Sequence, residues 1–177
     1  GAGFYLDATQ EPWSEHFKMY SYILKDLLSA VESNFPADMK RLGVFGHSMG
    51  GHGALTIAFK NPELFKSVSV FAPICAPTKA PWGENAFTRY LGEDRNLWQD
   101  YDACDLARAK GWPSDILIDQ GEDDEYLADH LKPELLEQAC EDKGIPIQLR
   151  RHSGYDHSYF FISTFIGDHI LWHSERL

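Results

Sequence analysis

The chain has 177 residues, the length of one domain, and its 44% hydrophobic content is ample for a buried core. Its 27 acidic and 16 basic residues give a formal net charge of −11, which opposes contact with nucleic-acid phosphates and with anionic lipid. No apolar stretch approaches the roughly 20 residues that a transmembrane helix needs. We therefore expect a soluble protein without nucleic-acid or membrane partners.

No signal segment with a charged start and an apolar centre opens the chain. The three cysteines, Cys75, Cys104 and Cys140, stand at wide, unrelated spacings that fit neither a disulfide framework nor a paired-cysteine metal site. We expect them to be reduced residues of the core, in a cytoplasmic protein that binds no metal.

The chain starts at Gly1, without an initiator methionine, and runs directly into apolar sequence, so we expect it to be the continuation of a longer fold. The first predicted element is an amphipathic helix over residues 13–35, with Ser14 as its N-cap and Pro36 at its end. Its apolar face repeats at intervals of three and four residues: Tyr20, Leu24, Leu27 and Val31.

Short apolar strands alternate with helices along the rest of the chain. The predicted strands are residues 42–45, 68–71, 116–118 and 147–149. The predicted helices run from just after Ser48 to about residue 61, over 133–143, and over 157–176. This alternation predicts an α/β protein with a parallel sheet covered on both faces. Residues 72–112 are weakly periodic and rich in proline, glycine and tryptophan, and we expect an irregular lid or substrate loop there, within one domain spanning residues 1–177.

Residues 46–50, Gly-His-Ser-Met-Gly, match the G-x-S-x-G pattern between a predicted strand and a predicted helix, which is the context that this motif requires. A serine at so sharp a turn takes a strained backbone conformation, and Gly46 and Gly50 permit it because they lack a Cβ. A glycine-rich turn can also bind phosphate or only connect two elements. The flanking strand and helix favour Ser48 as the nucleophile of a serine hydrolase with the α/β-hydrolase fold.

The helix that begins after Ser48 points free N–H groups and its positive end at the serine. The backbone N–H of Met49 is therefore our predicted oxyanion donor. Gly50, Gly51 and Gly53 would let this helix pack close to the sheet.

A serine hydroxyl needs a base, and the base needs a carboxylate to orient it. The eight histidines are His16, His47, His52, His130, His152, His157, His169 and His173. Three of these come too early or lie in the motif itself, and the last two fall inside the final helix. His157, on the loop after the fourth strand, is the predicted base, with His152 and His130 as alternatives.

The acid is expected after the third strand, in the segment Gln-Gly-Glu-Asp-Asp at residues 120–124. Asp119 ends the strand and is expected to point into the sheet or to cap a neighbour. Asp124, at the tip of the loop, is the predicted acid and Asp123 the alternative. Taken alone, an acidic run of this kind is more often a solvated turn.

Several blocks of sequence, in order, resemble the S-formylglutathione hydrolases, also called esterase D. They are GAGFYLDATQEPW (1–13), FGHSMGGHGA (45–54), FAPIC (71–75), PWG (81–83), ILIDQG (116–121) and GYDHSYFF (154–161). The resemblance implies a thioesterase that converts S-formylglutathione into glutathione and formate, acts on small carboxylic esters, forms a homodimer and needs no cofactor. It also places the family triad on Ser48, Asp124 and His157.

The resemblance further implies a substantial segment before Gly1, which supplies the first strands and the second oxyanion donor. We expect either a separate N-terminal polypeptide that completes the fold or an incomplete chain. Residues 1–177 alone are then expected to aggregate or to be nearly inactive, because exposed strand edges and a lost donor both carry a cost.

Trp82 and Tyr155 are the predicted substrate-binding residues, and packing of their loops onto the body of the domain is the alternative. Two other functions fit the sequence. The chain could belong to a broad-specificity carboxylesterase or acyl-transferring enzyme of the same fold, or to a non-catalytic scaffold.

Overall fold

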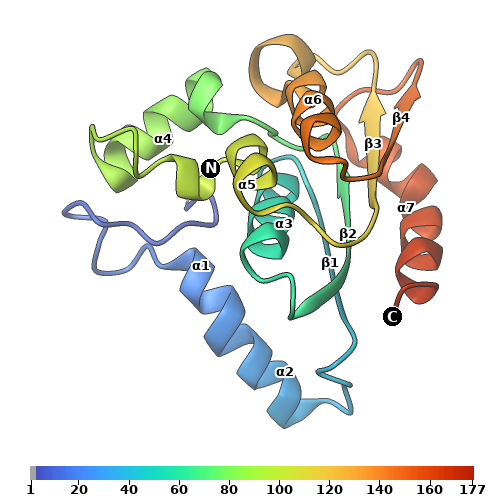
Figure 1. Ribbon diagram of the computed structural model, residues 1–177, viewed down its shortest axis with the longest axis horizontal. Coiled ribbons are helices and arrows are strands. Elements are labelled where there is room, and N and C mark those ends of the chain that lie inside the picture. Colours follow the sequence, from blue (N-terminus) through green and yellow to red (C-terminus); the bar gives the residue numbers. More distant parts are fainter. Residues whose placement is uncertain (1–2) are drawn as a thin grey trace.

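A four-stranded parallel sheet forms the centre of the computed structural model, which describes residues 3–177 (Figure 1). The strands are β1 (Leu42–His47), β2 (Phe65–Phe71), β3 (Ile116–Gly121) and β4 (Ile147–His152), and they lie in that order. Each neighbouring pair is parallel, as the alternation of strands and helices predicted. The α/β-hydrolase type of sheet is therefore confirmed.

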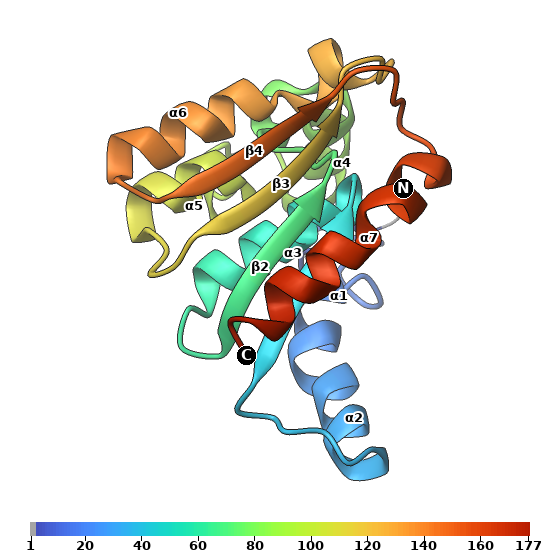
Figure 2. The ribbon, with the colours of Figure 1, turned by 90° about the vertical axis from the view of Figure 1, so that its right-hand side faces the viewer.

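Helices cover both faces of this sheet. They are α1 (Met19–Ser21), α2 (Leu28–Asn34), α3 (Met49–Lys60), α4 (Pro81–Leu91), α5 (Ala103–Lys110), α6 (Pro133–Lys143) and α7 (Tyr159–Ser174). Figure 2 shows α7 lying across one face of the sheet, with α3, α5 and α6 on the other. Among residues 3–177, no helix is long and apolar enough to span a bilayer.

Two clusters of buried side chains make the core. The larger lies between the sheet and the layer of α3, α5 and α6, and includes Phe59, Val70 and Leu136. The smaller gathers around α4 and the carboxyl end of β2, and includes Phe71 and Phe87. β2 and β3 are almost wholly buried, as expected of the central strands of a parallel sheet.

The first helix starts later than the sequence predicts, and Ser14 is not its N-cap. The N–H of Ser14 instead donates to the carbonyl of Gln10 in a turn. Residues 11–16 form turns, and Lys18, the residue before α1, makes an antiparallel bridge with Asp7. The helix continues through a π-helical segment, Tyr22–Leu27, into α2.

The expectation of an irregular region over residues 72–112 was wrong, because α4 and α5 lie within it. Pro81 opens α4 at a position where a missing N–H costs nothing, and Gly92 ends it with φ of +88°. Asp102 caps α5 by accepting from the N–H groups of Cys104 and Asp105.

All three cysteines are buried and unbridged, as expected of core residues. Burial raises the pKa of the Cys140 thiol to about 12, so this group is protonated and unreactive at neutral pH.

Candidate active site

Ser48 occupies a sharp turn between β1 and α3, with φ of +58° and ψ of −118°. A residue with a Cβ rarely adopts this conformation, and it costs of order 1–3 kcal/mol. Three backbone hydrogen bonds hold it: the Ser48 N–H donates to the Phe71 carbonyl at 2.9 Å, and the Ser48 carbonyl accepts from His52 at 3.0 Å and from Ile74 at 3.2 Å. The strain that the motif predicts is thus present and is fixed by β2 and the segment after it.

Close packing explains the glycine at position 46. A Cβ there would overlap the carbonyl of Gly50. Gly51 and Gly53 are also confined, the first against Pro73 and the second more closely against the ring of Tyr5. A Cβ on Gly50 would meet nothing closer than 3.7 Å, so the turn requires Gly46 but not Gly50.

Met49 is the first residue of α3. The first hydrogen bond within that helix runs from the His52 N–H to the Ser48 carbonyl. The N–H groups of Met49 and the two residues after it precede that bond, so they have no acceptor in the preceding turn and carry the positive end of the helix dipole. This position suits an oxyanion that forms on a group bound to Ser48.

His157 pairs with a buried carboxylate, that of Asp124. His157 Nδ1 lies 2.6 Å from Asp124 Oδ2, and the Asp124 side chain is completely inaccessible to solvent. The same carboxylate accepts from the Tyr126 N–H at 2.9 Å and from Gln120 Nε2 at 3.3 Å. These donors fix the carboxylate so that it can orient the imidazole. The alternative acid, Asp123, is solvent-exposed.

His157 also lies beside the serine turn. Its ring centroid is 4.4 Å from that of His47, the residue that precedes Ser48, and 5.1 Å from that of Tyr126. Burial, followed by the neighbouring His157, lowers the pKa of His47 to about 4. His47 is therefore neutral at physiological pH and adds no positive charge beside His157.

The alternative bases are held elsewhere. His152 stacks on Phe165 with its centroid at 3.9 Å, and its Nε2 lies 3.2 Å from Asp119. His130 stacks on Trp82 at 3.7 Å. Neither is paired with the buried carboxylate of Asp124.

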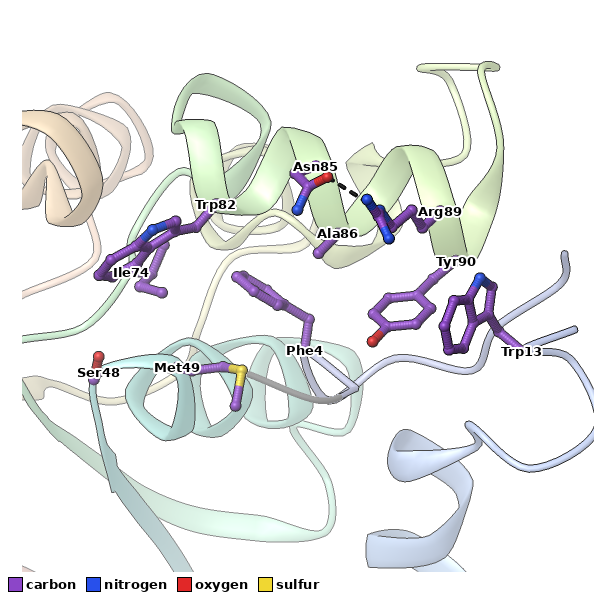
Figure 3. Close-up of a pocket in the computed structure, with 10 residues that line it drawn as sticks. All are labelled: Phe4, Trp13, Ser48, Met49, Ile74, Trp82, Asn85, Ala86, Arg89 and Tyr90. Atoms are coloured by element: carbon purple, nitrogen blue, oxygen red, sulfur yellow. Dashed lines mark hydrogen bonds between the residues drawn. The ribbon is translucent and has the colours of Figure 1, made fainter.

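Ser48 opens into a cavity of about 410 Å³, within the roughly 300–1,000 Å³ of ligand pockets (Figure 3). Its lining residues are Phe4, Trp13, Ser48, Met49, Ile74, Trp82, Asn85, Ala86, Arg89 and Tyr90. Of the two predicted substrate residues, Trp82 lines this cavity. Tyr155 does not; it packs among Phe161 and Phe165 in the smaller core cluster.

Sequence reasoning missed most of the cavity wall. Asn85 and Arg89 lie on α4, in the stretch that was expected to be irregular. The available signal was helical spacing after Pro81, since Trp82, Asn85 and Arg89 recur every three or four residues. Among residues 3–177, no group of three or more potential metal ligands comes together.

A strained serine at a strand-to-helix turn, a His–Asp pair beside it and a parallel sheet are the features of serine hydrolases of the α/β-hydrolase type. The family model described as "Putative esterase" matches residues 1–172, and the chain belongs to this esterase family.

The chain is similar over its whole length to curated S-formylglutathione hydrolases, at 54% identity for the protein of Bos taurus and 51% for that of Paracoccus denitrificans. It spans 64% and 63% of those relatives, which is less than two thirds of their length. The solved S-formylglutathione hydrolase of Agrobacterium tumefaciens superposes with a TM-score of 0.97 at 56% identity, over 99% of this chain and 64% of that one. An S-formylglutathione hydrolase structure from Staphylococcus aureus, with a TM-score of 0.71 at 22% identity over 94% of this chain and 66% of that one, shares the fold.

Proposed function

We propose that the protein carrying this chain is a thioesterase that hydrolyses S-formylglutathione to glutathione and formate. The observation that carries the proposal is the 2.6 Å contact between His157 Nδ1 and buried Asp124, beside a serine in the strained turn. The names of its relatives, at 51–56% identity, supply the substrate.

In the first half-reaction, Ser48 Oγ attacks the formyl carbon while His157 Nε2 takes the hydroxyl proton of Ser48. The Met49 N–H donates to the oxyanion that develops on the formyl oxygen. When this intermediate collapses, the carbon–sulfur bond breaks and His157 passes its proton to the departing thiolate. Glutathione leaves, and a formyl ester remains on Ser48.

In the second half-reaction, His157 takes a proton from water as the water oxygen attacks the formyl ester. The bond to Ser48 Oγ breaks and His157 returns the proton to the serine. The product leaves as formic acid, which gives its remaining proton to solvent and becomes formate. The Asp124 carboxylate stabilises the imidazolium that forms twice per turnover. These steps use only side chains, backbone groups and water.

Two further parts of the proposal concern the assembly. β1 is an edge strand that pairs only with β2 among the described residues, and Phe45 on it is 52% exposed. This exposure supports a further polypeptide segment that covers β1 and brings the second oxyanion donor.

Exposed Ile170 and Leu171 on α7 support a homodimer. The three buried, unbridged thiols support a cytoplasmic location.

The α4 and α5 region, residues 72–112, is proposed as the part of this single domain that forms the substrate wall, since α4 lines the cavity beside Ser48. Tyr155 is proposed to pack near the base and not to contact the substrate.

Steady-state kinetics on S-formylglutathione and on p-nitrophenyl acetate test the proposal. We expect kcat/KM for S-formylglutathione to exceed that for the aryl ester by at least tenfold. Equal or better turnover of the aryl ester would instead identify a broad-specificity carboxylesterase, and no turnover of either would favour a scaffold.

A further inference from the structure

The cavity beside Ser48 has one wall made by a single face of α4. Trp82, Asn85, Ala86 and Arg89 lie on successive turns of that helix and all line the cavity. Figure 3 shows Ser48 at one end of this row, next to Trp82, and Arg89 toward the other end, next to Tyr90. A substrate whose reacting carbon lies at Ser48 would therefore extend along α4 toward Arg89.

Arg89 is a cation without a carboxylate partner. Its Nε donates to Asn85 Oδ1 at 3.1 Å, and within residues 3–177 no acidic side chain forms an ion pair with it. Arg95, which follows α4, pairs with Glu84 at 3.0 Å instead. In a chain of net charge −11, an unpaired guanidinium at a cavity wall is a site for an anionic group of a ligand.

The hydrogen bond to Asn85 fixes how Arg89 can bind. It occupies Nε, which orients the planar guanidinium and leaves the two terminal nitrogens to donate together to one carboxylate. A lysine would place a single rotatable charge there and would lose the paired geometry.

Aromatic side chains line the rest of this end of the cavity. Trp13 packs edge-on against Tyr90 with centroids 5.6 Å apart, and both line the cavity together with Phe4. Arg89 is itself exposed to solvent, so an anionic group of a ligand can reach its guanidinium.

We propose that Arg89, held by Asn85, binds a carboxylate of the glutathione part of the substrate and so sets the specificity of the site. This inference rests on the proposed function, because a glutathione thioester carries carboxylates at the ends of a peptide whose sulfur lies at the reacting centre. Arg89 contacts the leaving group and not the formyl carbon, so it is expected to act on KM more than on kcat.

Arg89→Gln and Arg89→Lys, made in the whole protein, test this proposal. For Arg89→Gln, we expect KM for S-formylglutathione to rise about tenfold with kcat within about twofold. The ratio of kcat/KM for S-formylglutathione to that for neutral p-nitrophenyl acetate is expected to fall about tenfold, with Arg89→Lys in between. Arg95→Gln removes the same charge from a residue that does not line the cavity, and it is expected to leave the ratio unchanged.

Binding of S-methylglutathione, measured as competitive inhibition of aryl ester hydrolysis, separates this inference from the proposed function. Weaker inhibition of Arg89→Gln than of the wild-type protein supports the subsite, whether or not S-formylglutathione is turned over. Equal inhibition of the two proteins, or an equal loss in Arg95→Gln, would overturn it. Inhibition by S-methylglutathione without turnover of S-formylglutathione would overturn the proposed function and leave the subsite standing.

Discussion

His157 Nδ1 and Asp124 Oδ2 lie 2.6 Å apart, although 33 positions separate the two residues in the chain. Because Asp124 also accepts from Tyr126 and Gln120, its carboxylate cannot turn away from the imidazole without breaking other bonds. The pair is therefore preorganised to hold one tautomer of His157, with the proton on Nδ1 and the lone pair on Nε2.

Replacing Asp124 by Asn is expected to reduce kcat by about 10³–10⁴, because an amide can stabilise the wrong tautomer and carries no charge to balance the imidazolium. Stopped-flow or steady-state turnover measures the loss, and far-UV circular dichroism checks the fold. Asp123→Asn is the matched control, since that carboxylate is exposed and unpaired with His157. Comparable losses in both variants would mean that Asp124 is not the acid.

Gly46→Ala is expected to lower the free energy of unfolding by at least about 2 kcal/mol, because the added methyl overlaps the Gly50 carbonyl in a packed turn. Gly50→Ala adds the same methyl where the nearest atom is 3.7 Å away, inside a helix that favours alanine. It is expected to unfold at an equal or higher urea concentration than the wild-type protein. Equal destabilisation of the two variants would mean that the lack of a Cβ at Gly46 is not what the turn requires.

His52 is fully buried in α3, with Nε2 3.0 Å from the Phe4 carbonyl. Burial lowers its pKa to about 4, although the hydrogen bond to Phe4 acts in the opposite direction. The unfolded chain takes up a proton near pH 6.5, whereas the folded chain takes it up only near pH 4, so the stabilisation is complete above pH 6.5 and is lost as pH falls to 4.

The expected loss from His52 over that interval is about 3 kcal/mol. Urea unfolding at a series of pH values measures it. His52→Gln keeps a donor for the Phe4 carbonyl but does not titrate, so its stability is expected to fall less between pH 6.5 and 4. His16→Gln, at an exposed position, serves as the control and is expected to follow the wild-type curve.

A second network of polar side chains surrounds Asp119, on the face of the sheet covered by α7. Its buried carboxylate accepts from Arg150 and lies 3.1 Å from His169 Nε2, whose Nδ1 in turn contacts Ser69 at 2.8 Å. Burial alone would raise the pKa of Asp119, but the hydrogen bonds from His169 and Arg150, together with nearby His152, outweigh it and lower the pKa to about 2.

Asp119→Asn is therefore expected to cost about 3–5 kcal/mol of stability, since it leaves a guanidinium facing a neutral group within the network. Asp168→Asn removes the other, half-exposed partner of Arg150 and is expected to cost less than about 1 kcal/mol. Chemical unfolding of the two variants measures both losses. If neither variant loses more than about 1 kcal/mol of stability, the network does not contribute to the packing of α7 on the sheet.

The turn at Ser48 and the pairing of His157 with Asp124 could be predicted because each depends on local order along the chain. A strand, a G-x-S-x-G turn and a helix stand next to one another at Ser48, and the loops that follow β3 and β4 must end at the same edge of a parallel sheet as that turn. His157 and Asp124 were chosen on that reasoning, and the structure brings them together.

Other features depend on contacts between distant segments. The start of α1 is set by the pairing of Asp7 with Lys18, which no helical periodicity shows. The Asp119 network joins β2, β3, β4 and α7, and the polar residues Ser69 and His169 give no sign in the sequence that they meet. The cavity wall on α4 was missed because the proline and glycine at its two ends were taken as marks of a loop, although both are ordinary helix boundaries.

Labelling with a fluorophosphonate probe, followed by mass spectrometry of the labelled peptide, tests the central claim most directly. The account predicts one adduct, on Ser48, that disappears in Ser48→Ala and forms more slowly in Asp124→Asn. An adduct on another residue, or labelling that persists in Ser48→Ala, would contradict it.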